Sequence, residues 1–286
     1  MKWIFLFISV IALSRLGIAQ TNTYSSPESI QSTIPSKINA EAPNPFKGFG
    51  SPWKHSCALN IDNYYSPKIQ GATEVGNILL LRGVFATKRH MVRATLPFVS
   101  IATPNGYRSG IGNFNIFDII HLTNDSSNIH FGLGPLDSAP SATSSVLGVD
   151  QWQFGGSALI AHVNQSGIIT GGLATYRTAL FGIDHGLNGG GYLTLQPALL
   201  LNMGNGLYGR SMGATCIFDF NNKKTLIPIG IGIGQFFKAG NAIVNIFIEP
   251  GFTVYSEGEN LPAYQVLIGM YFFWLKDKKQ SNAMPD

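Results

Sequence analysis

Residues 242–255 of the chain read AIVNIFIEPGFTVY. Its even-numbered positions are all apolar, whereas polar residues fall on odd-numbered positions such as Asn245, Glu249 and Thr253. Successive side chains of a β-strand point to opposite faces, so one face of this strand suits lipid and the other tolerates water. Soluble strands average roughly five or six residues, and spanning strands need about nine to eleven. The stretch therefore predicts a membrane-spanning strand.

Three other stretches repeat this alternation at a similar length: residues 192–203, 226–237 and 264–274. Glycine, asparagine, aspartate, serine and proline interrupt the pattern between stretches, as expected of turns. Along the whole chain the pattern predicts eleven strands, which begin near Asn77, Met91, Gly110, Ile129, Gln151, Ile168, Tyr192, Leu207, Thr225, Ala242 and Ala263.

The connections between these strands alternate between short ones, such as residues 86–90, and long ones, such as residues 137–150. Bacterial outer-membrane barrels have an even number of strands, short periplasmic turns and longer outer loops. If residues 86–90 are a periplasmic turn, one more strand must precede the eleven, and we place it between residues 55 and 68. This segment alternates poorly, so a loop or a short helix is the competing interpretation.

The expected fold class is therefore all-β: a transmembrane antiparallel up-and-down β-barrel of about 12 strands with short periplasmic turns, over residues 55–276. Residues 1–19 are expected to be a signal peptide, because a short apolar run follows Lys2 and small residues precede a cleavage site after Ala19. A membrane anchor is the alternative, but this run is shorter than the ~20 residues of a spanning helix. Residues 20–54, rich in polar residues and proline, predict a flexible linker, and residues 277–286 a periplasmic tail.

Composition narrows the expected partners and location. Charged residues make up only 12% of the chain, about half of the ~25% usual in soluble proteins. Basic residues gather in predicted turns and the tail without an interleaved aromatic stripe, so no nucleic-acid partner is expected. We expect a bacterial outer-membrane location. The expected partners are the lipid bilayer, a small solute, and the outer-membrane assembly machinery through the aromatic residues 271–274 of the last strand.

The same alternation assigns several polar side chains to the barrel interior, the lumen. The candidate lumen-lining residues are Arg82, Arg93, Gln153, Arg177, Gln196 and Glu249. They either line a pore or neutralise one another as structural pairs that fill a narrow barrel. Two residues do not fit the alternation: Asp118 predicts a bulge or an interior turn, and Arg210 predicts a position near the periplasmic interface.

No catalytic, cofactor-binding or metal site is predicted, and the protein is not expected to be an enzyme. The six histidines are scattered, and no nucleophile motif is present. His121 and His130 flank one predicted turn, which is also expected of ordinary histidines at a membrane interface. The glycines at 230, 232 and 234 lie within a strand, so they do not predict a nucleotide-binding loop. Cys57 and Cys216 are either a disulfide of an exported protein or two isolated side chains, and we favour the second.

Several short motifs occur in order along the chain: NYY at 63–65, LLLRG at 79–83, GNFNIFD at 112–118, FGLGP at 131–135, WQFG at 152–155, LQP at 195–197, PIGIGIG at 228–234 and FIEP at 247–250. Through their order over residues 61–275, the chain resembles the outer-membrane β-barrel family of the meta-pathway of phenol degradation type, whose members are described as transporters. The resemblance implies passage of hydrophobic or aromatic compounds. It implies no catalytic residues.

The leading hypothesis is an outer-membrane channel or transporter that passes a small, hydrophobic or aromatic molecule by passive or facilitated diffusion. One alternative is a closed structural or binding barrel with no transport. The other is an outer-membrane lipid-modifying enzyme, which predicts a serine or histidine cluster at one rim of the barrel.

Overall fold

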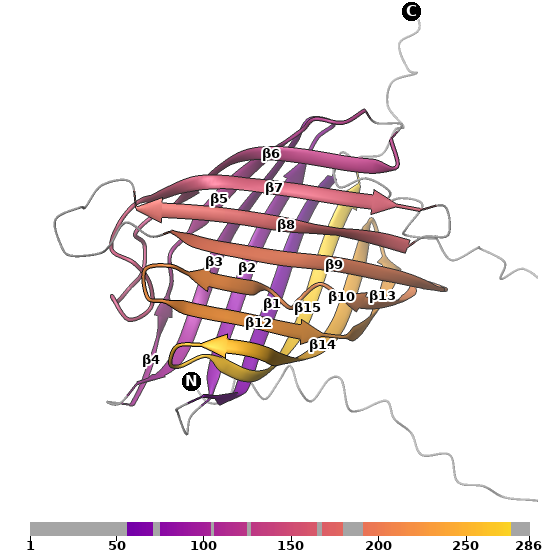
Figure 1. Ribbon diagram of the computed structural model, residues 1–286. Coiled ribbons are helices and arrows are strands. Elements are labelled where there is room, and N and C mark those ends of the chain that lie inside the picture. The colour runs from indigo at the N-terminus through magenta and orange to yellow at the C-terminus, as the bar shows by residue number, and fades with distance from the viewer. Residues whose placement is uncertain are drawn as a thin grey trace, which may run out of the picture. The chain divides into compact units, whose positions relative to one another are not determined.

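The described part of the chain forms one β-sheet that closes into a barrel (Figure 1). The computed structural model describes residues 56–70, 75–103, 106–124, 127–164, 168–179 and 191–275. These residues form strands, bends and turns, and none of them belongs to a helix that is long and apolar enough to cross a membrane. The predicted signal peptide (1–19), linker (20–54) and tail (277–286) lie outside the described residues.

The sheet contains fifteen strand segments, each antiparallel to its neighbours. They are β1 (Ser56–Ile69), β2 (Gly76–Ala86), β3 (His90–Thr103), β4 (Gly106–Ile111), β5 (Asn115–His121), β6 (Ile129–Ser138), β7 (Gln153–Val163), β8 (Ile168–Ala179), β9 (Tyr192–Gly204), β10 (Leu207–Ser211), β11 (Cys216–Asp219), β12 (Lys224–Gly230), β13 (Gly232–Ala239), β14 (Ala242–Glu257) and β15 (Pro262–Leu275). Three strands are interrupted, and each contributes two segments: β4 with β5, β10 with β11, and β12 with β13. The barrel therefore has twelve strands, which confirms the predicted fold class.

The barrel closes where the last strand pairs with the first. The register between β1 and β15 runs from Ser56 opposite Leu275 to Ile69 opposite Pro262, and β1 pairs with β2 along its other edge. The strand expected between residues 55 and 68 is therefore present, and the loop and helix interpretations of this segment are wrong. A closed ring satisfies the backbone hydrogen bonds between strands, which is what allows strands to cross a bilayer.

The alternation predicted for residues 242–255 is confirmed in β14 from Asn245 to Thr253; a register shift against β12 follows, and Tyr255 is exposed on the outer face. Ile248 and Phe252 are 44% and 56% exposed on the outer face, whereas Glu249 between them is 2% exposed. The neighbouring strand β15 has the same inner and outer faces as β14, because its Ile268 lies opposite Ile248. An outer surface of exposed isoleucine and phenylalanine side chains suits lipid rather than water.

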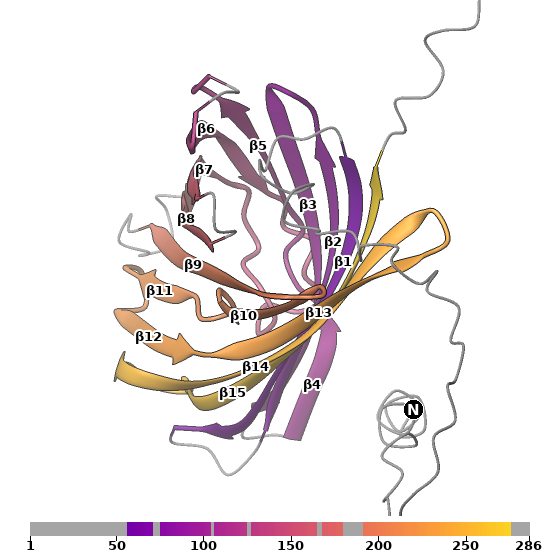
Figure 2. The same cartoon turned by 90° about the vertical axis from the view of Figure 1, so that its right-hand side faces the viewer.

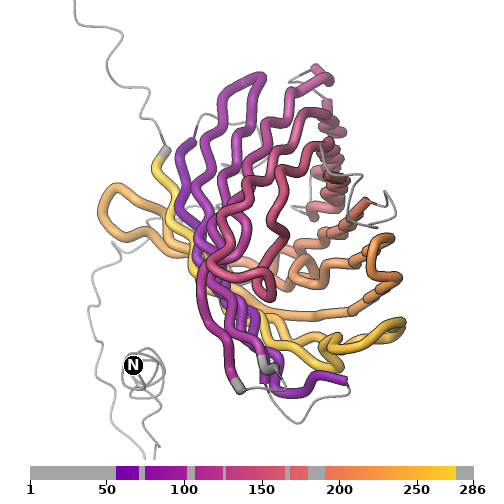
Figure 3. The backbone as a smooth tube through the Cα atoms, turned by 90° about the vertical axis from the view of Figure 1, so that its left-hand side faces the viewer, coloured from indigo at the N-terminus to yellow at the C-terminus, as the bar shows by residue number. Residues whose placement is uncertain are grey.

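The two ends of the barrel differ (Figures 2 and 3). We call the end that carries Ser56 and Leu275 the turn end; the connections from β2 to β3, β7 to β8, β9 to β10 and β13 to β14 also lie there. The β9–β10 turn is tight, with Gly204, Asn205 and Gly206 all at positive φ, a conformation that glycine and asparagine tolerate. The opposite end, which we call the loop end, carries the long connection of residues 139–152 between β6 and β7.

The expectation of a bulge or an interior turn at Asp118 is wrong. Asp118 lies opposite Val92 in a continuous register between β3 and β5. Its neighbours Phe117 and Ile119 are buried on the inner face, so Asp118 faces outward. Its Oδ2 lies 2.8 Å from Nδ1 of His90 at the start of β3. This partner offsets part of the cost of placing a carboxylate on the outer face near the turn end.

The inner wall carries one apolar cluster, which we call the apolar inner patch. Its centre is Phe117, Ile119 and Leu136, which are at most 3% exposed. Met91, Leu159 and Leu173 pack against this centre and are only partly buried. The patch lies on the inner face of β3, β5, β6, β7 and β8, so the lumen wall has an apolar surface there.

Candidate functional site

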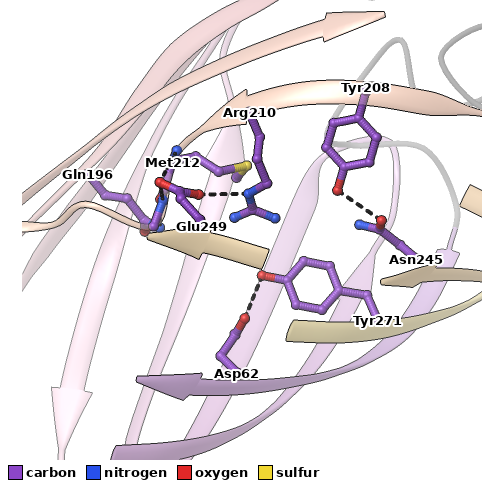
Figure 4. Close-up of polar contacts among 9 residues, drawn as sticks. Asp62, Gln196, Tyr208, Arg210, Met212, Asn245, Glu249 and Tyr271 are labelled. Atoms are coloured by element: carbon purple, nitrogen blue, oxygen red, sulfur yellow. Dashed lines mark hydrogen bonds and ion pairs between the residues drawn. The ribbon is translucent and has the colours of Figure 1, made fainter. Parts of the chain in front are cut away.

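The carboxylate of Glu249 is the centre of a polar cluster on the inner wall (Figure 4). Its Oε2 accepts a hydrogen bond from Nε of Arg210 at 2.7 Å. Its Oε1 accepts hydrogen bonds from the backbone N–H groups of Met212 at 3.0 Å and Gly213 at 2.7 Å. The side chains of Arg210 and Glu249 are 2% and 1% exposed. Full partnering of both oxygens is what a carboxylate with so little solvent contact requires.

Glycines allow this ion pair to form across an intervening strand. Arg210 lies on β10, Glu249 lies on β14, and β13 runs between them, with Gly232 opposite Arg210. A Cβ on Gly230 would come within 2.9 Å of Glu249 Oε1, and a Cβ on Gly232 within 2.7 Å of Glu249 Cβ. The glycine run at 230, 232 and 234 therefore leaves the inner face of β12 and β13 open to the two long side chains.

The segment between β10 and β11, residues 212–215, bends toward the lumen. β10 pairs with β13 and β11 pairs with β12, but residues 212–215 belong to no register pair in the described sheet. Nε2 of Gln196 donates a hydrogen bond to the Met212 carbonyl at 2.6 Å. A Cβ on Gly213 would overlap the side chain of Leu267 on the inner face of β15. Gln196 and Glu249 together hold this segment inside the barrel.

A second ion pair lies on the neighbouring strands β1 and β2. The Asp62 carboxylate, whose side chain is 0% exposed, pairs with Nη1 of Arg82. It also accepts a hydrogen bond from the Tyr271 hydroxyl at 2.8 Å (Figure 4). These residues meet because β1 pairs with β2 on one edge and with β15 on the other.

Aromatic rings connect the two ion pairs. The Cζ atom of Arg210 lies 3.4 Å from the centroid of the Phe247 ring, and this ring packs edge-on against Tyr271 with centroids 4.9 Å apart. Closer to the turn end, the hydroxyl of Tyr208 donates to Oδ1 of Asn245 at 2.8 Å. Side chains therefore fill the lumen along the wall formed by β10, β14, β15, β1 and β2.

Replacing Tyr271 by phenylalanine tests the Asp62 pair. The Tyr271→Phe variant is expected to lose about 1.5–3 kcal/mol of unfolding free energy, because it removes one hydrogen bond to a buried carboxylate. Chemical unfolding in detergent, followed by tryptophan fluorescence, measures this loss. Tyr255→Phe on the outer face is the matched control, because Tyr255 is 51% exposed. Equal stability of both variants would contradict this role for the Tyr271 hydroxyl.

The structure distributes the six predicted residues over several places instead of one network. Arg82 and Glu249 belong to different ion pairs, and Gln196 binds the inward segment at 212–215. Gln153 is 5% exposed at the start of β7. Arg93 and Arg177 pack on aromatic rings instead, with their Cζ atoms 4.4 Å from the centroid of Phe117 and 4.7 Å from that of Tyr192.

The partners in both ion pairs were not among the predicted residues. Arg210 was expected near the periplasmic interface, and this expectation is wrong, because its side chain is buried in the lumen against Glu249. Asp62 was missed because its strand was inferred only from barrel closure, which leaves the inward face of the strand unassigned. The alternation of Leu59 and Ile61 with Asn60 and Asp62 was the available signal.

The loop of residues 139–152 packs against the inner face of β4, and Figure 2 shows it within the ring of strands. A Cβ on Gly110, whose partner Val99 is on β3, would meet Thr143 and Leu147 of this loop. Asn113, in the interruption between β4 and β5, anchors the loop. Its Nδ2 donates to the carbonyls of residues 139 and 149 at 3.0 and 2.7 Å, and its Oδ1 accepts from the N–H of residue 149 at 2.8 Å. The loop end of the lumen is therefore narrowed by a fixed loop.

The two histidines at the predicted turn do meet. Nε2 of His121 lies 3.3 Å from Nδ1 of His130 and 2.9 Å from Oγ1 of Thr123. His130 is 3% exposed, and His121 lies opposite Gly132 on the inner face. This histidine pair therefore lies on the inner face near the turn end of the barrel.

The described residues support neither a disulfide between the two cysteines nor a metal site. Cys57 and Cys216 are free thiols there. No group of three or more metal-ligating side chains occurs in the part of the chain that the structure describes.

Comparison with known proteins finds similarity at the level of fold. No protein-family model and no curated protein matches the chain by sequence. An outer-membrane channel from Pseudomonas putida F1 is similar in structure, with a TM-score of 0.55 and 12% identity over 77% of this chain and 94% of that one. The barrel is of the outer-membrane type.

Two further solved structures are more distant. A bacterial polysaccharide outer-membrane secretin has a TM-score of 0.37 and 8% identity over 77% of this chain and 98% of that one. The outer-membrane phospholipase A from Escherichia coli has a TM-score of 0.30 and 9% identity over 77% and 97%. Scores this low do not bear on the function of the chain.

Proposed function

We propose that the protein is an outer-membrane channel that passes a small, hydrophobic or aromatic molecule by passive or facilitated diffusion. The observation that carries the proposal is the closed twelve-stranded barrel with an apolar outer face and an inner face that carries Arg93 and Arg177 outside any described ion pair. Charged side chains inside a lipid-embedded barrel are expected where water or a solute passes. The similar fold of the Pseudomonas putida channel supports the proposal.

The location and the family are parts of the same proposal. Export through the signal peptide of residues 1–19 would deliver the chain to the bacterial outer membrane, with the turn end in the periplasm. The aromatic end of β15 would engage the assembly machinery. Membership of the meta-pathway barrel family fits the order of short motifs along the chain. The expectation that the protein is not an enzyme is part of the same proposal.

Reconstitution into planar lipid bilayers tests the proposal. The purified protein is expected to conduct ions in discrete steps and to migrate differently on gels before and after heating, as stable outer-membrane barrels do. A protein that remains soluble without detergent would exclude the membrane location. A folded barrel in lipid that conducts nothing would exclude the channel.

The second candidate is a closed barrel without transport, and two observations favour it over the enzyme. The polar cluster around Glu249 fills one side of the lumen, and the loop of residues 139–152 narrows the loop end. A closed barrel predicts no ion current in the wild type, and shortening the loop then shows whether the loop or the polar cluster closes the lumen. A channel predicts ion current in the wild type and in the loop-shortened variant.

A further inference from the structure

Two arginines on the inner wall have no acidic partner. Arg82 and Arg210 pair with carboxylates, but Arg93 and Arg177 have no carboxylate at ion-pair distance in the described part of the chain. Their Nε atoms are buried and form no hydrogen bond with any described residue. Neither arginine is therefore ion-paired in the described structure, although Asp219 is near enough to Arg177, and Asp62 to Arg93, to interact with it electrostatically.

Both guanidinium groups are held in a similar way. Each lies over an aromatic ring, Arg93 over Phe117 and Arg177 over Tyr192. The ring covers one face of the guanidinium and fixes its orientation, but a ring attracts a cation more weakly than a carboxylate does. The N–H groups in the guanidinium plane match the two oxygens of a carboxylate. Each arginine is thus oriented to bind an anion.

Arg93 also borders an apolar surface. Phe117, on which it lies, belongs to the centre of the apolar inner patch, and Met91 lies two residues from Arg93 on the same face of β3. Met91, Leu159 and Leu173 are partly exposed on this patch. A bound carboxylate at Arg93 would therefore have apolar side chains beside it that suit a hydrophobic body.

The two arginines lie at different depths along the barrel. Arg177 is near the loop end, because β8 ends there at Ala179, and Arg93 is near the turn end, because β3 begins there at His90. An anion that enters from the loop end would meet Arg177 first and Arg93 later. Arg177 would therefore attract an anion into the lumen, and Arg93 would give it a second binding site farther along.

We propose that the solute is a small organic carboxylate with an apolar body, such as an aromatic acid, and that Arg177 and Arg93 bind its carboxylate in turn. The proposal rests on the channel function proposed above and names the class of solute. It also predicts that the channel prefers anions to cations.

Single-channel recording with two matched probes tests the proposal. Benzoate and benzamide have nearly the same shape, but only benzoate is charged at pH 7. Benzoate is expected to interrupt the ion current through the wild-type protein, and benzamide is not. The reversal potential in a potassium chloride gradient is expected to show that chloride is preferred to potassium.

Arg93→Gln and Arg177→Gln are the test variants, and Arg89→Gln is the matched control, because Arg89 is exposed in the β2–β3 turn. Each test change is expected to lower the chloride-to-potassium permeability ratio by about sevenfold, because one unit charge at roughly 7 Å in water attracts the anion and repels the cation by about threefold each. The double variant is expected to lose the benzoate interruptions, and the control to keep them.

The outcomes separate the two proposals. A wild-type barrel that conducts no ions overturns the channel and the carboxylate proposal with it. A wild-type barrel that conducts ions but responds equally to benzoate and benzamide leaves the channel intact and overturns the carboxylate proposal. If the variants do not assemble, the wild-type comparison of the two probes still decides between these results.

Discussion

Replacing Glu249 by glutamine is expected to lower the free energy of unfolding by about 3–5 kcal/mol, the largest stability effect in the barrel. The variant leaves the guanidinium of Arg210 buried without a negative partner, since its side chain is 2% exposed. The glutamine oxygen can still accept hydrogen bonds from Met212 and Gly213, so the loss reports mainly on the charge. Guanidinium unfolding in detergent, followed by tryptophan fluorescence, gives the midpoint and slope from which the loss is calculated.

The double variant Arg210→Met with Glu249→Gln is the control for this prediction. It removes both charges and keeps the acceptor for the two backbone N–H groups, so it is expected to recover most of the lost stability. If the double variant is as unstable as the single one, the ion pair is not the cause of the loss. Conductance of the single variant then shows whether the inward segment at 212–215 also affects the pore.

Releasing the inward loop is expected to raise the single-channel conductance several-fold, the largest functional effect that the structure predicts. Asn113→Ala removes three hydrogen bonds between Asn113 and the loop of residues 139–152. Each such bond contributes about 0.5–1.5 kcal/mol, so the loop is expected to leave the inner face of β4 for a large part of the time. Current recordings are expected to become larger and noisier.

A shortened loop keeps this prediction testable if a single substitution releases too little. Replacing residues 141–148 by two glycines removes Thr143 and Leu147, the side chains that face Gly110. This variant is expected to give the larger current without the noise. Asn222→Ala, in the β11–β12 turn, is the control, because Asn222 is exposed and bonds only within its own turn in the described structure. Unchanged conductance in both test variants would mean that the loop does not limit the current.

Much of the barrel could be predicted because its signals are local. The alternation of residues 242–255 is a property of one strand, and it persists in β14 because lipid and lumen impose opposite polarity on the two faces. The first strand was less visible in its own residues, but the even number of strands required it between residues 55 and 68.

The site was less predictable because it depends on contacts between distant strands. Glu249 was assigned to the inner face correctly by its position in the alternation, but its partner Arg210 depends on the glycines of the strand between them. The interruptions at 112–114 and 212–215 arise from bonds to a loop and to a carboxylate elsewhere in the chain. No local pattern encodes such bonds, so both segments were expected to continue as regular strand.

The interruption at 212–215 also makes this part of the barrel wall different from the continuously paired strands. β7 and β8 are joined by backbone pairing from Gln153 to Val163, and no side-chain substitution removes bonds of that type directly. Where β10 and β11 border β13 and β12, backbone pairing is missing for several residues. Hydrogen bonds to side chains such as Glu249 hold the chain there instead. When the barrel is heated or pulled, its strands are expected to separate first along this boundary. Point mutations at Glu249 or in residues 212–215 are therefore expected to weaken this boundary more than point mutations weaken the continuous β7–β8 pairing.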